Sequence, residues 1–121
     1  MIKIAIIEDD PTISQMYRMK FESEGFDVRM ASNGKIGVDV VKTFKPDIIL
    51  LDIQMPEMDG TAALKLIRAN KDSAETPVII LTNLGEEEAP NEMRQLGISS
   101  YIVKANNTPR QVVAHVKNTI A

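Results

Sequence analysis

Five short apolar runs alternate with longer segments whose apolar residues have helical spacing, and this alternation constrains the fold more than any other feature. Each run has the length of a strand and is rich in β-branched residues. The runs cover residues 3–8, 27–31, 48–52, 78–82 and 100–104. The central runs are apolar at consecutive positions, which is typical of strands that are buried on both faces of a parallel sheet. The order therefore predicts an α/β fold of five βα units, with helices covering both faces of the sheet.

Capping residues mark the ends of several predicted helices. Asp10-Pro11 and Thr108-Pro109 each place an N-cap acceptor before a proline that fits the first helical position. Gly25 and Gly97 stand where a left-handed C-cap residue belongs. Because Pro90 would break a helix that began at residue 86, we expect the fourth helix to start near residue 89, with residues 86–88 as a connection.

Composition narrows the class of protein. With 121 residues there is room for one domain, residues 1–121, and the near absence of aromatic residues (4%) requires a core of Ile, Val, Leu and Met. The net charge of -3 argues against nucleic acid as a direct partner. The absence of Cys excludes disulfides, thiolate zinc sites and cysteine catalysis. No apolar run is long enough to span a bilayer and the first residues do not resemble a signal peptide, so we expect a cytoplasmic protein without membrane insertion.

Polar residues stand at the carboxyl ends of four predicted strands. They are Glu8, Asp9 and Asp10 after the first strand, Asp52 after the third, Thr82 at the end of the fourth and Lys104 after the fifth. Ligands of open α/β sheets bind beyond these strand ends. Clustered carboxylates stay ionised only with a cation among them, and a few carboxylates with open positions suit Mg²⁺ better than Ca²⁺. Such a set suggests phosphoryl transfer, with a carboxylate attacking phosphorus and the metal, ammonium and hydroxyl holding the phosphoryl oxygens.

A structural role is the simpler interpretation for some of these residues. A single acid at a strand end is more often a turn or a cap, and Asp10 is best interpreted as the N-cap of the first helix. Asp52 differs because it follows four apolar residues and leaves a buried strand directly into a loop, where an unpartnered carboxylate is costly. Lys104 has the same character after Ile102 and Val103.

The run Asp52-Ile53-Gln54-Met55-Pro56-Glu57-Met58-Asp59-Gly60 resembles the signature loop of response-regulator receiver domains, the phospho-acceptor modules of two-component signalling. The likeness extends in order over nearly all of the chain, through Glu8-Asp9, Thr82 and Lys104. It implies a flavodoxin-like sheet with strand order 2-1-3-4-5. It also implies a module that catalyses only its own phosphorylation and dephosphorylation and is otherwise no enzyme.

The resemblance also implies roles for individual residues. Asp52 would be the phosphorylated residue and would share a Mg²⁺ ion with Asp9, with Glu8 through water and with the backbone carbonyl of Gln54. The phosphoryl group would come from a histidine kinase or histidine phosphotransfer protein.

Three further residues have roles by the same likeness. Lys104 would pair with the phosphoryl group, Thr82 would bind it in the active state, and Tyr101 would be the switch aromatic. A downstream protein would bind at the fourth helix, fifth strand and fifth helix, so we expect a stand-alone receiver that switches this surface.

One departure from the family pattern leads to a further expectation. Receivers usually follow the lysine with a proline in a cis peptide, whereas Ala105 follows Lys104 here, and we expect the Lys104–Ala105 peptide to be cis.

Two other functions compete with phosphorylation. A pseudo-receiver scaffold that takes no phosphate would not need the intact set of acids, hydroxyl and lysine. An aspartate-based phosphohydrolase would carry a second Asp where Gln54 stands.

Overall fold

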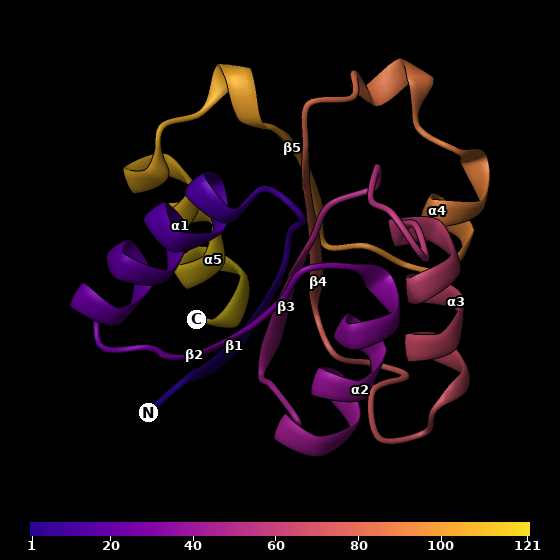
Figure 1. The fold of residues 1–121 in the computed structure, drawn as a ribbon, viewed down its shortest axis with the longest axis horizontal. Coiled ribbons are helices and arrows are strands. Elements are labelled where there is room, and N and C mark those ends of the chain that lie inside the picture. Colours follow the sequence, from indigo (N-terminus) through magenta and orange to yellow (C-terminus); the bar gives the residue numbers. More distant parts are fainter.

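The computed structural model describes residues 1–121 and contains one five-stranded sheet in the order β2-β1-β3-β4-β5, with every neighbouring pair parallel (Figure 1). This order confirms the flavodoxin-like topology. The strands are β1 (Lys3–Ile7), β2 (Asp27–Ala31), β3 (Ile48–Leu51), β4 (Val78–Thr82) and β5 (Ser100–Val103). The α-helices are α1 (Pro11–Ser23), α2 (Gly34–Phe44), α3 (Gly60–Ala69), α4 (Asn91–Gln95) and α5 (Pro109–Ile120). Two 3-10 turns complete the chain, η1 (Glu86–Glu88) and η2 (Lys104–Asn106).

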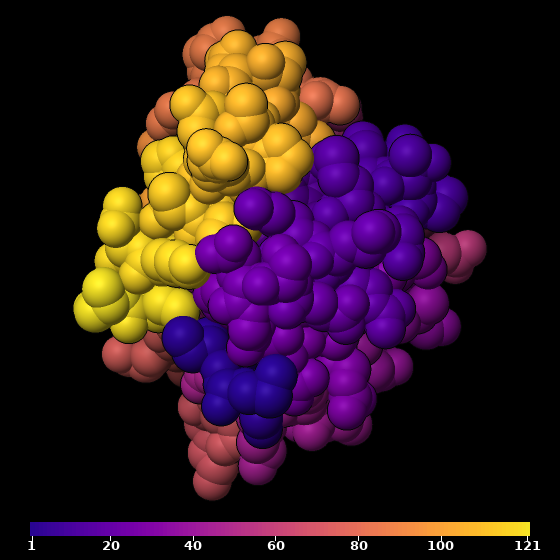
Figure 2. All heavy atoms as spheres, turned by 90° about the vertical axis from the view of Figure 1, so that its left-hand side faces the viewer, coloured from indigo at the N-terminus to yellow at the C-terminus, as the bar shows by residue number.

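The sheet separates two apolar cores. Helices α1 and α5 cover one face, where they lie side by side, and α2, α3 and α4 cover the other (Figures 1 and 2). Successive strand residues point to opposite faces, so Ile4 and Ile6 of β1 enter the first core while Ala5 and Ile7 enter the second. Consecutive apolar residues are needed in the central strands because both of their faces are buried.

The predicted capping residues Asp10, Thr108, Gly25 and Gly97 are confirmed. The Asp10 carboxylate accepts hydrogen bonds from two amides of the first turn of α1, at 2.9 and 3.1 Å. Thr108 forms a reciprocal capping box with Gln111 at the start of α5. Gly25 and Gly97 have positive φ angles of 88° and 84°, a conformation that glycine adopts without steric cost. No helix is both long and apolar enough to cross a membrane.

The fourth helix is shorter than expected. It begins at Asn91 rather than near residue 89 and ends at Gln95, and residues 86–88 form the turn η1. Pro90 occupies the N-cap position, and no side chain caps the helix there. Only Met93 of this helix is buried. The helix that borders the predicted output surface is therefore held by few contacts.

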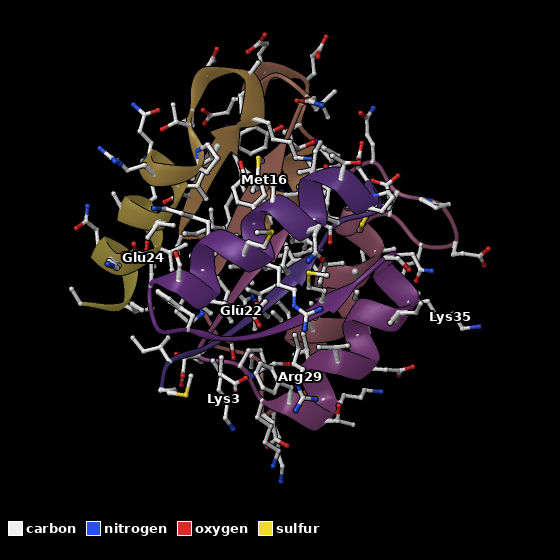
Figure 3. The ribbon with its side chains drawn as sticks, turned by 60° about the vertical axis from the view of Figure 1, so that its left-hand side comes forward. Lys3, Met16, Glu22, Glu24, Arg29 and Lys35 are labelled. Carbon is white, nitrogen blue, oxygen red and sulfur yellow. The ribbon has the colours of Figure 1, made fainter.

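Methionine contributes less to the core than the composition suggested. Met93 is fully buried, whereas Met16 and Met19 are exposed on the outer face of α1, where Met16 projects away from the sheet (Figure 3). Tyr17 and Phe21 occupy the inner face of this helix and fill the space against the sheet.

Candidate functional site

Three carboxylates meet at the carboxyl ends of β1 and β3. Ile7 and Leu51, the last residues of these neighbouring strands, are register partners, so the residues that follow them leave the sheet side by side. One carboxylate oxygen each from Glu8, Asp9 and Asp52 lies within 4.8 Å of the others. Glu8 and Asp52 are 5% and 6% exposed, while Asp9 is exposed. The cluster thus has a buried wall and one side that is open to solvent.

Lys104 extends from the end of β5 into this cluster. Its ammonium group donates to Glu8 Oε1 and, at 3.2 Å, to Asp52 Oδ2, and its side chain is 9% exposed. Burial alone would lower the pKa of Lys104, but the adjacent Glu8 and Asp52 carboxylates outweigh this effect and raise it. The lysine is therefore positively charged at neutral pH.

The pKa of Glu8 is also shifted by its surroundings, and here burial has the largest effect. Burial raises the pKa of its carboxyl group, and the hydrogen bonds from Lys104 and from the Asp10 backbone amide oppose that rise only in part. The nearby Asp52 carboxylate raises the pKa further. A cation bound among these acids would favour the ionised form of Glu8.

A small cavity of about 180 Å³ opens onto the acids and contains most of the predicted site residues. Its lining consists of Glu8, Asp9, Asp10, Ile13, Asp52, Gln54, Thr82, Asn83 and Lys104. The cavity has space for several water molecules or a small tetrahedral anion. A larger hollow of about 610 Å³ lies against the outer face of α1, but no ionisable side chain lines it. We therefore place the site at the smaller cavity.

Two glycines hold the loop that follows Asp52. A Cβ atom on Gly60 would lie 2.1 Å from the backbone oxygen of Asp52, and one on Gly34 would lie 2.4 Å from that of Met58. The amide of Gly34 donates to this same Met58 oxygen at 3.0 Å. The loop is therefore clamped between the first residues of α2 and α3. Sequence reasoning missed Gly34, because a glycine at the start of a helix gives no sign of the distant backbone it contacts.

The expected cis peptide after Lys104 is wrong, since every peptide bond in the chain is trans. Lys104 instead begins the turn η2, in which the amide of Asn107 donates to the Lys104 carbonyl at 3.3 Å. The side-chain amide of Asn107 also donates to the Val103 carbonyl, at 3.2 Å. These contacts fold the chain back after β5 and let the lysine reach the acids along a trans backbone.

A comparison with known families matches residues 4–117 to the family described as "Response regulator receiver domain". The chain belongs to this family. The receiver is thus a signalling module rather than an enzyme that acts on other substrates.

Curated relatives extend beyond the matched region. "Transcriptional regulatory protein SrrA" of Staphylococcus aureus is 37% identical over 115 residues, which are 95% of this chain and 46% of that protein. "Regulatory protein AtoC" of Escherichia coli is 35% identical over 102 residues, which are 84% of this chain and 22% of that protein. The receiver therefore spans less than half the length of these relatives.

Solved structures agree with this fold. The receiver domain of the Francisella response regulator 1452 has a TM-score of 0.86 and 32% identity, covering 99% of this chain and 97% of its own. The chemotaxis protein CheY4 of Vibrio cholerae has a TM-score of 0.91 at 24% identity, covering 98% of each chain, and at that identity it supports the fold alone.

The acid cluster of the receiver is suited to a metal ion. Its donors are carboxylate oxygens, which are hard ligands, and its three acids face a single lysine ammonium group. A divalent cation would balance the remaining negative charge, and Asp9 offers it an exposed ligand on the open side. Glu8, Asp9 and Asp52 are therefore able to bind such an ion.

Tyr101 of the receiver lies outside the cavity but is linked to its wall. The tyrosine hydroxyl donates to the Leu84 carbonyl at 2.8 Å. The Leu84 amide in turn donates to Thr82 Oγ1 over a long 3.4 Å, and Thr82 is fully buried beside the acids. Leu84 thus connects the Thr82 hydroxyl at the cavity to Tyr101 on β5.

Proposed function

We propose that this receiver accepts a phosphoryl group on Asp52 from the phosphohistidine of a histidine kinase or a histidine phosphotransfer protein, in a Mg²⁺-dependent reaction. The observation that carries the proposal is the position of the Asp52 carboxylate, which accepts a hydrogen bond from a buried lysine, lies within 4.8 Å of two other acids and lines a small open cavity. An acid with a purely structural role would not need the Lys104 ammonium group, the Thr82 hydroxyl and an open cavity beside it.

The proposed transfer forms a bond between an Asp52 carboxylate oxygen and phosphorus while the phosphorus–nitrogen bond to histidine breaks. The leaving imidazole nitrogen takes up a proton. Asp52 Oδ1 accepts the Ile53 amide at 2.7 Å, which fixes the orientation of the carboxylate. Lys104 and the Thr82 hydroxyl would hold oxygens of the arriving group, where its negative charge is spread.

We assign the metal ligands to Glu8, Asp9, Asp52 and the backbone carbonyl of Gln54, with Glu8 acting through water. When bound, Mg²⁺ would neutralise charge shared between the carboxylate and the phosphoryl oxygens. Gln54 lines the cavity, and the Gly60 contact fixes the backbone direction just after Asp52.

Phosphorylation would then act on the surface formed by α4, β5 and α5. A phosphoryl group offers strong acceptors to the Thr82 hydroxyl and would draw it away from the Leu84 amide. The carbonyl oxygen of Leu84 accepts a hydrogen bond from the Tyr101 hydroxyl, so a movement of Leu84 would reach the tyrosine. A downstream protein that binds α4, β5 and α5 would detect the new arrangement.

Mass spectrometry after incubation with Mg²⁺ and acetyl phosphate tests the proposal. The wild type should gain one phosphoryl group, Asp52→Asn should gain none, and Asp9→Ala should need a higher Mg²⁺ concentration. Asp10→Ala is the matched control, because Asp10 caps α1 and should leave the metal requirement unchanged. Labelling of Asp52→Asn, or labelling without a divalent ion, would contradict the assignment. A wild type that takes no label would favour the pseudo-receiver.

A further inference from the structure

Arg68, in the last turn of α3, joins three segments of the backbone. Its guanidinium group donates four hydrogen bonds of 2.8–2.9 Å to carbonyl oxygens. Two acceptors, Ser73 and Thr76, belong to the connection between α3 and β4. The other two, Leu96 and Gly97, belong to the turn that ends α4 and leads into β5.

The bonding of Arg68 is entirely to the backbone. No carboxylate forms an ion pair with it, although arginine is well suited to such pairs. Leu96 and Gly97 follow the last turn of α4, where unpaired carbonyls and the helix dipole favour a cation. Removing the guanidinium group would leave four carbonyls without this donor.

The two ends of α4 are held in different ways. At the N-terminal end, Pro90 is the N-cap and no side chain caps the helix. Arg94, in the last turn of α4, donates to Glu86 of the preceding turn η1 at 2.8 Å, but both side chains are about half exposed (52% and 54%), and such pairs contribute little. At the C-terminal end, the Arg68 bonds fix the turn, and Gly97 has a φ of 84° that few other residues would tolerate. One end is therefore free to move at small cost and the other is not.

We propose that Arg68 is a positioning residue that makes the turn at residues 96–97 a fixed pivot for α4. The rearrangement that follows phosphorylation is then confined to residues 83–95 and to the Tyr101 side chain, and β5 keeps its register. This inference rests on the proposed function for its trigger. The pivot itself rests on the hydrogen bonds of Arg68.

The test is NMR of the full chain with and without Mg²⁺ and beryllofluoride, a mimic of the phosphoryl group. In the wild type, the Arg68 Nε–H should stay protected from exchange in both states, and the shift changes beyond the cavity should fall within residues 83–95 and at Tyr101. Arg68→Lys keeps the charge, but an ammonium group cannot span four carbonyls. Amide exchange at residues 96–99 should become about tenfold faster in this variant, and the mimic-induced changes should spread to these residues.

Arg94→Lys is the matched control, since it alters an exposed ion pair between the same helix and η1 and leaves the Arg68 bonds in place. It should leave exchange at residues 96–99 unchanged. Labelling of Asp52 by acetyl phosphate should be the same in Arg68→Lys and wild type, because Arg68 does not contact the cavity.

Three results would overturn the pivot. One is loss of Arg68 Nε–H protection when the mimic binds the wild type. Another is an unchanged, confined response in Arg68→Lys. The third is a uniform loss of protection over the whole sheet of that variant, which would show a merely structural role. A wild type that shows no response to the mimic would overturn the proposed function, and the exchange rates without the mimic would still decide whether Arg68 fixes the turn.

Discussion

Replacing Lys104 with methionine tests the electrostatic account of the site, because it removes the ammonium group and keeps much of the side-chain volume. The lysine contacts Glu8 and Asp52, and all three side chains are almost completely buried. Removing one partner of a buried ion pair costs about 3–5 kcal/mol, since the remaining charge loses its compensation. We expect about 3 kcal/mol at pH 7 without metal, near the lower limit, because Glu8 can take up a proton.

The pH dependence of this loss has a definite sign. Burial raises the pKa of Glu8 in the folded protein, so this group stabilises the fold below its unfolded pKa and ceases to do so as the pH rises through its folded pKa. Loss of the Lys104 ammonium group removes an interaction that lowers the pKa of Glu8. The folded pKa of Glu8 therefore rises further in Lys104→Met. The stability difference between the variant and the wild type should be smaller at pH 5 than at pH 7.

Urea unfolding followed by far-UV circular dichroism measures the effect. A loss of 3 kcal/mol corresponds to a midpoint shift of about 1.5 M for a slope of about 2 kcal/mol per molar urea. Millimolar Mg²⁺ should restore part of the loss at pH 7, because it replaces the missing positive charge. Lys117→Met is the control. Lys117 of α5 pairs with Glu24, which follows the last turn of α1 (Figure 3). Both side chains are partly exposed, so loss of this pair should not move the midpoint. A Lys104→Met variant as stable as the wild type at pH 7 without metal would refute the reasoning.

Three other substitutions test single contacts by the same urea assay. Gly60→Ala should lower stability by about 1–3 kcal/mol, because its Cβ would meet the Asp52 backbone, and by more than Gly85→Ala, whose Cβ would meet only the end of the flexible Glu87 side chain; equal losses would disprove the clamp. Asp10→Ala should cost about 1 kcal/mol through loss of the α1 cap, and a loss near zero would remove that role. Tyr101→Phe should cost about 1 kcal/mol through loss of its hydrogen bond to the β4–α4 connection, and no change would show that the bond is dispensable.

The proximity of the acids, Thr82 and Lys104 could be predicted because it depends on topology alone. All the strands are parallel, so Glu8, Asp52 and Lys104, which follow strands, and Thr82, which ends one, lie at one edge of the sheet (Figure 1). Their proximity follows from strand assignment and needs no knowledge of loop conformation. The conformation of the loop after β5 was predicted wrongly, because the Lys104–Ala105 peptide is trans and not cis.

The supporting contacts could not be predicted because they join side chains to distant backbone. Arg68 donates to carbonyls up to 29 residues away, and carbonyl acceptors leave no mark on the sequence. Gly34 contacts the backbone of Met58, which any residue type at that position would supply. The start of α4 was misplaced by two residues: Pro90 was expected within the first turn, but it is the N-cap, so the helix begins at Asn91.

The division of the apolar interior by the sheet has a consequence for engineering. The α1–α5 core and the core beneath α2, α3 and α4 share no buried residue. Substitutions in contact couple strongly, whereas those without shared partners usually add. Libraries that diversify the first core for heat tolerance and the second for a new output partner could therefore be selected separately and recombined. A recombined protein should then retain both gains.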